Sequence, residues 1–268
     1  MPSMNEKIRN YVNDLLQNRK VKGCLGLIRT HVHVRPYLFT HTDELQHLSL
    51  GDVDHHGDAR YPLVKILTRL MRQNPFDTFA IVGRGCDERA IGKLVKSSQI
   101  DGNRLIMVGF SCPEELADRH GCLKPYPDCL VAGSKPDAGA GTEVVADTER
   151  NFIRDLKSIT EWNDRCIKCY GCRNICPVCF CRECTLEEAT HISQGTLPPD
   201  PDFLLTRAIH MVDYCVYCGL CEEACPADIP LTTIFKMVAD IISEQHGHLI
   251  RGVPSRGDAE RRGTLQRT

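Results

Sequence analysis

The feature that most constrains this chain is a cysteine pattern that occurs twice. In each copy, four cysteines are separated by two, two and three residues, and a proline follows the fourth. The first run is Cys166, Cys169, Cys172 and Cys176, and the second is Cys215, Cys218, Cys221 and Cys225. Three thiolates spaced two residues apart can wrap one cubane in a tight loop while the fourth faces away. The pattern therefore predicts two 4Fe–4S clusters.

The same spacing predicts how the ligands are shared. In the bacterial ferredoxin pattern the fourth cysteine of each run ligates the other cluster. We therefore expect Cys225 to complete the cluster of the first run and Cys176 to complete that of the second. Zinc is the alternative, because paired C-x2-C elements also make four-thiolate zinc sites. A zinc site needs only four thiolates from two C-x2-C pairs. Each run here has three evenly spaced cysteines followed by Cys-Pro, and this surplus favours iron–sulfur clusters.

Three further cysteines, Cys179, Cys181 and Cys184, directly follow the first run. Adjacent thiols in a cluster-bearing protein invite metal binding or oxidation, so packing alone does not explain them. They follow Cys176 too closely to fold back onto the first cubane without displacing its ligands. We therefore predict a third 4Fe–4S cluster, which needs a fourth ligand from elsewhere in the chain.

The N-terminal half offers four candidates for that ligand. Cys86 and Cys112 each lie at the carboxyl end of a predicted parallel strand, the edge where α/β sheets place ligands. Cys86 also lies at a predicted helix N-terminus, where the macrodipole favours a thiolate. A buried structural role is the alternative for both residues. Cys122 and Cys129, on either side of a proline-rich loop, could belong to the same extra site.

Composition places the chain among ordinary globular proteins. Its 268 residues suffice for two domains with their own cores, and 42% are hydrophobic and 25% charged. A formal net charge of −2 gives no electrostatic basis for nucleic-acid binding. No apolar run approaches the roughly 20 residues of a membrane span, and the N-terminus lacks signal-peptide features. We therefore expect a cytoplasmic protein in which thiols bind metal rather than form disulfides.

Hydrophobic periodicity predicts an α/β domain over residues 1–149. Residues 1–20 form an amphipathic segment with Ile8, Val12, Leu15 and Leu16 on one face. The elements expected after it are a helix at Tyr61–Arg72, a strand at Thr78–Val82, a helix at Asp87–Ser98 and a strand at Arg104–Gly109. These make a β-α-β unit, which implies parallel strands covered by helices.

The rest of the chain is predicted to be an α-helical, dicluster ferredoxin-like domain over residues 150–245. Residues 131–149, rich in glycine, alanine and aspartate, indicate a linker in front of it. The expected helices are Asn151–Thr160, Phe203–Tyr214 and Leu231–Ser243, with the cysteine runs between them. Residues 246–268 predict a flexible basic tail, which is either solvated or a docking arm for an acidic partner.

Two glycines, Gly83 and Gly85, lie in the turn between the first predicted strand of the β-α-β unit and its helix. Such a turn could cradle a phosphate of a nucleotide or flavin, which makes both glycines candidate FAD contacts. The alternative is a purely conformational need for glycine, because the full dinucleotide fingerprint is absent. The six histidines between His31 and His56 lack the spacing of a metal site. Cys24 stands alone and is expected in the core.

The sequence also resembles known redox subunits. The stretch IVGRGCDERAIGKLVKSSQIDGNRLIMVGFSCPEEL is similar to the β-α-β core of the beta subunits of deazaflavin-dependent hydrogenases and dehydrogenases. The stretches RCIKCYGCRNICPVCFCRECTLE and YCVYCGLCEEACPADIPL resemble dicluster subunits of heterodisulfide-reductase-like and formate-dehydrogenase complexes. The resemblance implies electron transfer between a flavin or cluster chain and a catalytic partner, and several beta subunits bind FAD.

Together these features predict an electron-relay subunit of an anaerobic oxidoreductase complex. Its partners would be other subunits of that complex, of flavin-, hydrogenase-, formate-dehydrogenase- or heterodisulfide-reductase-like type. The alternative is an enzyme with its own flavin in the α/β domain that reduces a diffusible acceptor. Flavin released on denaturation would separate the two hypotheses.

Overall fold

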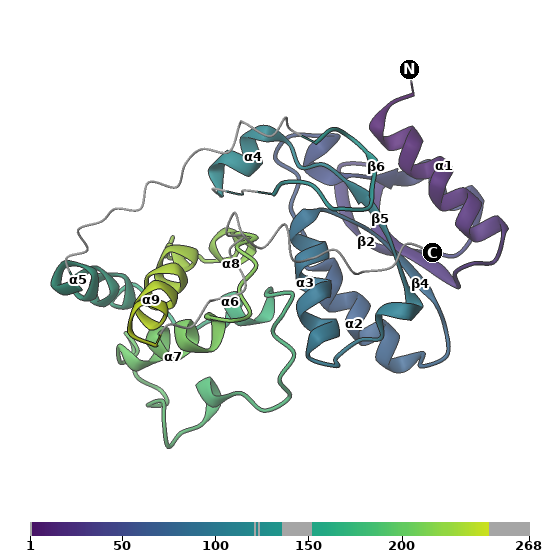
Figure 1. Ribbon diagram of the computed structural model, residues 1–268. Helices are drawn as coiled ribbons and strands as arrows, with labels where there is room; N and C mark the ends of the chain where they lie inside the picture. The colour runs from purple at the N-terminus through teal and green to yellow at the C-terminus, as the bar shows by residue number, and fades with distance from the viewer. Residues whose placement is uncertain (1, 121, 123, 136–151, 247–268) are drawn as a thin grey trace. The chain divides into compact units, whose positions relative to one another are not determined.

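The computed structural model describes residues 2–120, 122, 124–135 and 152–246 (Figure 1). The chain divides into two compact units. The first unit comprises Met1–Val144, Tyr170–Arg182 and Tyr217–Asp228, and the second comprises Val145–Cys169, Glu183–Val216 and Ile229–Thr268. Parts of both cysteine runs thus group with the N-terminal half. The predicted domain boundary near 149 and the predicted tail beyond 246 lie outside the described residues and stay predictions.

The first unit is built on a six-stranded sheet covered by helices (Figure 1). Its strands run in the order β2-β1-β4-β5-β6, and β3 pairs with β1. Neighbouring pairs from β1 to β6 are parallel, whereas β2 and β3 pair antiparallel with β1. The strands are β1 (Gly23–Thr30), β2 (His33–Phe39), β3 (Leu48–Ser49), β4 (Phe79–Gly83), β5 (Leu105–Phe110) and β6 (Leu130–Ala132).

The predicted β-α-β unit is confirmed. Strands β4 and β5 pair in parallel from Phe79 with Leu105 to Gly83 with Gly109, and α3 (Gly85–Lys96) connects them. The preceding helix α2 (Leu63–Gln73) buries one apolar face, as its periodicity predicts. Helix α3 begins two residues before the predicted start, so Gly85 and Cys86 belong to its first turn rather than to a preceding loop.

The antiparallel part of the sheet was not predicted from the sequence. Strand β1 is buried from Gly23 to Ile28. Such a strand reads as a continuous apolar run rather than an alternating one. The predicted linker over 131–149 was wrong at its start, because β6 extends through Ala132. The purely parallel core therefore becomes a mixed sheet.

The amphipathic N-terminal segment forms α1 (Met4–Gln17), and this prediction is confirmed. Ser3 and Glu6 make a capping box that satisfies backbone N–H groups at the start of the helix. The buried side chains Ile8, Val12 and Leu15 pack into a core with residues of β1, β2, β4 and β5. The predicted core position of Cys24 in β1 is also confirmed, because its side chain is fully buried.

The second unit is helical. It contains α5 (Phe152–Asn163), α7 (Asp202–Met211) and α9 (Leu231–His246), which correspond to the three helices predicted there. Helices α7 and α9 pack together, with Phe203 and Phe235 almost fully buried.

The first unit also contains the short helices α4 (Glu114–Arg119), α6 (Gly171–Asn174) and α8 (Leu220–Glu223). Among the described residues, no helix is long and apolar enough to cross a membrane.

Candidate metal centre

The two cysteine runs adopt the same backbone. Lys168 and Tyr170 of the first run have left-handed φ angles of 50° and 57°. Tyr217 and Gly219 occupy the matching positions of the second run, with φ angles of 51° and 75°. In each run, the short helix α6 or α8 begins directly after the second of these residues and carries the third cysteine.

This shared backbone fits the chemistry that the spacing predicts. A left-handed residue before the second cysteine and another after it bend the chain sharply, as three thiolates around one cubane require. The left-handed region costs a residue with a Cβ roughly 1–2 kcal/mol, and three of the four residues here are not glycine. Strained backbone of this kind clusters at functional sites, where the surroundings hold it in place. The loops therefore have the form of a cluster-binding segment.

The predicted ligands are distributed over both units. Helices α6 and α8 pack against each other in the first unit. The first unit holds Cys172, Cys176, Cys179, Cys181, Cys218, Cys221 and Cys225, and the second holds Cys166, Cys169, Cys184 and Cys215. Within the described ranges, no three cysteine, histidine or acidic side chains converge closely enough to hold one metal ion. The individual ligand sets therefore stay predictions from the motif.

Cys86 and Cys112 both lie at the carboxyl edge of the sheet, as predicted. Burial raises the pKa of the Cys86 thiol to about 12, and Asp87 acts in the same direction against Arg89 and Arg60. Burial therefore opposes the effect of the helix terminus on this thiol, and the role of Cys86 as a ligand stays a prediction. Burial likewise raises the pKa of Cys112.

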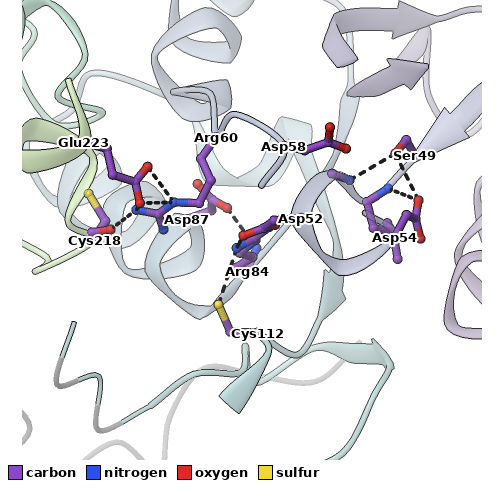
Figure 2. Close-up of polar contacts among 12 residues, drawn as sticks. Ser49, Asp52, Asp54, Asp58, Arg60, Arg84, Asp87, Cys112, Cys218 and Glu223 are labelled. Carbon is purple, nitrogen blue, oxygen red and sulfur yellow. Dashed lines mark hydrogen bonds and ion pairs between the residues drawn. The ribbon is translucent and has the colours of Figure 1, made fainter. Parts of the chain in front are cut away.

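A buried arginine, Arg84, organises the surroundings of Cys112 (Figure 2). Its Nη1 lies 3.5 Å from the Cys112 Sγ and 3.1 Å from the Asp52 Oδ2, and its Nη2 pairs with the Asp52 Oδ1. The guanidinium also lies 5.3 Å from the centre of the Phe110 ring. The pKa of Arg84 is raised because these partners outweigh its burial. Cys112 therefore has a permanent cation beside its sulfur.

The other two candidate cysteines have opposite surroundings. Arg89 Nη2 lies 3.5 Å from the Cys122 Sγ, so a cation faces this thiol. The Cys129 thiol donates to Glu88 Oε1 at 3.5 Å instead. Burial and this carboxylate raise the pKa of Cys129 to about 12. Of the two, Cys122 has the surroundings that suit a thiolate ligand.

The glycines of the predicted phosphate turn have packing roles. A Cβ on Gly85 would lie 2.6 Å from the carbonyl oxygens of both Lys124 and Tyr126. A Cβ on Gly83 would lie 3.0 Å from Met107 Cε and 3.1 Å from Asp87 Cβ. Close backbone approach therefore explains Gly85 without a bound phosphate, and carbonyl oxygens would repel an anion at this face. The proposed FAD contact of these glycines stays a prediction.

The second cysteine loop is fastened to the α/β part of the same unit by Arg60 (Figure 2). Its Nη2 donates to the Cys218 carbonyl oxygen at 2.5 Å. Its Nε lies 3.0 and 3.1 Å from the two carboxylate oxygens of Glu223. His120 Nε2 lies 3.3 Å from Glu223 Oε1, and the ring packs against Gly219. Sequence reasoning missed these residues, since no local signal links positions more than 100 residues apart.

Comparison with known families decides the nature of the second run. Residues 208–230, which contain all four of its cysteines, match the family described as a 4Fe-4S binding domain. The chain carries a 4Fe–4S binding domain. The match supports an iron–sulfur cluster rather than zinc at this segment.

The resemblance to beta subunits is also confirmed. An F420-dependent formate dehydrogenase subunit beta from Methanocaldococcus jannaschii is 48% identical over 105 residues, or 38% of this chain and 28% of that protein. The F420-dependent formate dehydrogenase 1 subunit beta from Methanococcus maripaludis is 47% identical over 140 residues, or 49% of this chain and 36% of that protein.

A more distant relative belongs to another complex. The acetyl-CoA decarbonylase/synthase complex subunit alpha 1 from Methanosarcina mazei is 30% identical over 113 residues, or 40% of this chain and 12% of that protein. The aligned part of the chain covers about a third or less of the length of the two beta subunits. It covers a smaller share of the acetyl-CoA decarbonylase/synthase subunit.

Proposed function

We propose that this chain relays electrons between partner subunits of an oxidoreductase complex through 4Fe–4S clusters. The observation that carries the proposal is the identical backbone of the two cysteine loops, with left-handed residues at matching positions. A single 4Fe–4S site would need only one such loop. Two loops whose short helices pack together suit a dicluster module, which passes electrons and performs no bond chemistry of its own.

The proposed ligand sets follow the crossed ferredoxin pattern. Cys166, Cys169, Cys172 and Cys225 hold one cluster, and Cys215, Cys218, Cys221 and Cys176 hold the other. Each cluster, when bound, accepts and donates one electron. The protein supplies the thiolates, the burial and the nearby charges that set how readily this happens. Cys176, Cys215 and Cys221 of the second set are buried, whereas no cysteine of the first set is.

We further propose a third cluster on Cys179, Cys181 and Cys184, with Cys86 or Cys112 as the fourth ligand. Cys179 and Cys181 belong to the same unit as both candidates. Of the two, Cys112 has the surroundings better suited to a thiolate, because Arg84 lies beside its sulfur. A buried thiolate needs such a partner, since burial alone favours the neutral form. The third cluster would extend the relay into the α/β part.

The partners are proposed from the relatives. Two of them are named as formate dehydrogenase subunits and one as a subunit of an acetyl-CoA decarbonylase/synthase complex. We infer that this chain also works inside a redox complex, where it connects a flavin or ferredoxin donor with a catalytic subunit. The alternative, a flavin enzyme that reduces a diffusible acceptor, has less support because the contacts of Gly85 explain that glycine without a phosphate.

The test is to count iron, acid-labile sulfide, zinc and flavin on anaerobically prepared full-length protein. Two clusters give about eight irons per chain and three give about twelve, at four per cubane. The Cys112→Ala and Cys86→Ala variants then show which residue completes the third site, because that variant alone should return to about eight irons. A chain that binds stoichiometric zinc, or fewer than about eight irons after reconstitution, contradicts the proposal.

A further inference from the structure

We propose that Arg60 and Glu223 are positioning residues that set the reduction potential of the cluster held by the second cysteine run. This inference rests on the proposed function, because it assumes that the run holds a redox-active cluster. It goes beyond that function in assigning roles to two residues that ligate nothing. The observation behind it is a partly buried charge pair whose arginine is hydrogen-bonded directly to the backbone of a predicted ligand.

The geometry of the pair fixes a positive charge beside the loop. The Arg60 side chain is only 10% exposed, and its guanidinium donates both to the Cys218 carbonyl oxygen and to the Glu223 carboxylate. Arginine is planar and carries its donors in a rigid fork, so two simultaneous contacts define its position. Figure 2 shows the guanidinium lying between Cys218 and Glu223. All three residues belong to the first unit.

Both members of the pair are ionised at neutral pH. Burial lowers the pKa of Arg60, but the nearby Glu223 carboxylate outweighs it and the net shift is upward. Both carboxylate oxygens of Glu223 lie within 3.1 Å of Arg60 Nε, and this neighbouring cation favours the ionised carboxylate. Arginine is not deprotonated in proteins. The pair therefore acts as a fixed charge distribution rather than as a titrating group.

Opposite charges at this position have opposite effects on reduction. Gaining one electron makes the thiolate-bound cluster more negative. Arg60 favours that state and so raises the potential, whereas Glu223 opposes it and lowers the potential. The charge of Arg60, whose side chain is 10% exposed, is screened less by solvent than that of Glu223, which is 32% exposed. Net charge and hydrogen bonding near the sulfurs are among the main determinants of iron–sulfur potentials.

The first cysteine loop has no acidic residue at the position of Glu223, which distinguishes it from the second. Asn174 occupies the position that corresponds to Glu223, two residues before the fourth cysteine. The contact made there from the α/β part is from Lys65 Nζ to the Arg173 carbonyl oxygen, at 3.0 Å. The two loops thus share a backbone but differ in the charge fixed beside them. We infer that the pair lets the protein adjust one potential without changing the other.

The experiment is a potentiometric titration of the anaerobic full-length protein, followed by electron paramagnetic resonance, with iron and sulfide counted in every sample. Arg60→Met should lower one midpoint potential, and Glu223→Gln should raise the same one. Arg60→Lys keeps the charge and should restore most of the wild-type value. Arg104→Met is the matched control, because Arg104 also contacts a carboxylate and backbone carbonyls but lies at the amino end of β5. It should shift neither potential.

The opposite signs separate an electrostatic role from a structural one. A merely structural pair would give shifts of the same sign, or loss of iron, in Arg60→Met and Glu223→Gln alike. Shifts of the same sign, or unchanged potentials at full iron content, overturn the proposal. If Arg60→Met loses iron, the proposal is tested with Glu223→Gln and Arg60→Lys instead. An unchanged midpoint potential in Glu223→Gln then overturns the proposal. A wild-type chain without clusters would instead refute the proposed function itself.

Discussion

The first and second cysteine loops have the same backbone in different surroundings. Tyr170 and Gly219 both take a left-handed φ before the third cysteine of their run. The Tyr170 ring stacks against the Arg173 guanidinium, whose Cζ lies 4.8 Å from the ring centre. Gly219 is buried under His120, beside the Arg60–Glu223 pair. The comparison teaches that the repeated motif determines the loop, whereas contacts from distant parts of the chain distinguish one loop from the other.

The largest expected effect tests whether the two loops depend on each other. Cys225→Ser should destroy the cluster of Cys166, Cys169 and Cys172, because the fourth ligand is crossed between the runs. Iron should fall by about four per chain, and the lost electron paramagnetic resonance signal should be the one that Cys169→Ser also removes. If Cys225→Ser instead removes the signal lost in Cys218→Ser, each loop holds its own cluster and the crossed assignment is wrong.

The second prediction concerns the different packing of the two left-handed positions. Gly219→Ala places a Cβ 2.1 Å from His120 Cε1 on a residue with φ of +75°, so clash and strain add. We expect a loss of about 2 kcal/mol or more in the free energy of unfolding. The matched change Tyr170→Gly relieves a left-handed residue and should cost less than about 1 kcal/mol. Both are measured by chemical denaturation under anaerobic conditions.

A double variant separates the two causes of this effect. His120→Ala opens the space that the new Cβ would occupy, so Gly219→Ala should cost less in its presence by about 1 kcal/mol, leaving mainly the backbone strain. If the two changes are additive, His120 does not constrain Gly219 and the packing contrast between the loops is not real.

A smaller effect is expected at the contact that the first loop makes with the α/β part. Lys65→Met removes the hydrogen bond to the Arg173 carbonyl while keeping an apolar side chain of similar length. We expect a loss of about 1 kcal/mol, as for a partly exposed hydrogen bond from a charged donor. Lys22→Met, which removes an exposed contact with Asp77, is the control and should change the unfolding free energy by less than about 0.5 kcal/mol. Equal effects would remove any special role of Lys65.

The smallest effect is expected at the stack of Arg173 on Tyr170 in the first loop. Arg173→Ala removes this cation, and both side chains are only partly buried. A cation–π interaction at such a site contributes about 0.5–1 kcal/mol. Because Arg173 also bonds Asn174 Oδ1 through its guanidinium, Asn174→Ala is measured in parallel by thermal denaturation. A loss above about 2 kcal/mol would mean that this stack, rather than the backbone alone, holds the loop.

Local sequence patterns predicted the elements that local physics determines. The 3.6-residue periodicity found α1, α2, α7 and α9, and the β-α-β unit followed from two apolar strands around a helix. Strand β1 was missed because a strand buried over one long stretch does not alternate. Strand β2, which lies at the edge of the sheet and contains Pro36, was missed as well. The left-handed residues were also hidden, since three of the four are lysine or tyrosine rather than glycine.

The candidate site divides in the same way. Spacing alone predicts the ligand cysteines, because a cubane needs thiolates at fixed separations. It could not identify Arg60, which reaches Cys218 across 158 positions of sequence. It also could not show the burial of Cys86, which raises the pKa of this thiol against the effect of the helix terminus. Ligand chemistry is local, whereas the dielectric surroundings of the ligands are a property of the folded chain.

The central claim is that the two runs form one module with two 4Fe–4S clusters and crossed ligands. The most direct test is electron paramagnetic resonance of the fully reduced, anaerobically prepared protein, with the spins quantified against the iron content. We predict two spins per chain whose signals are broadened and split by mutual magnetic coupling, because each run supplies a ligand to the other's cluster. Two sharp, non-interacting signals, or a single spin per chain, would contradict this account.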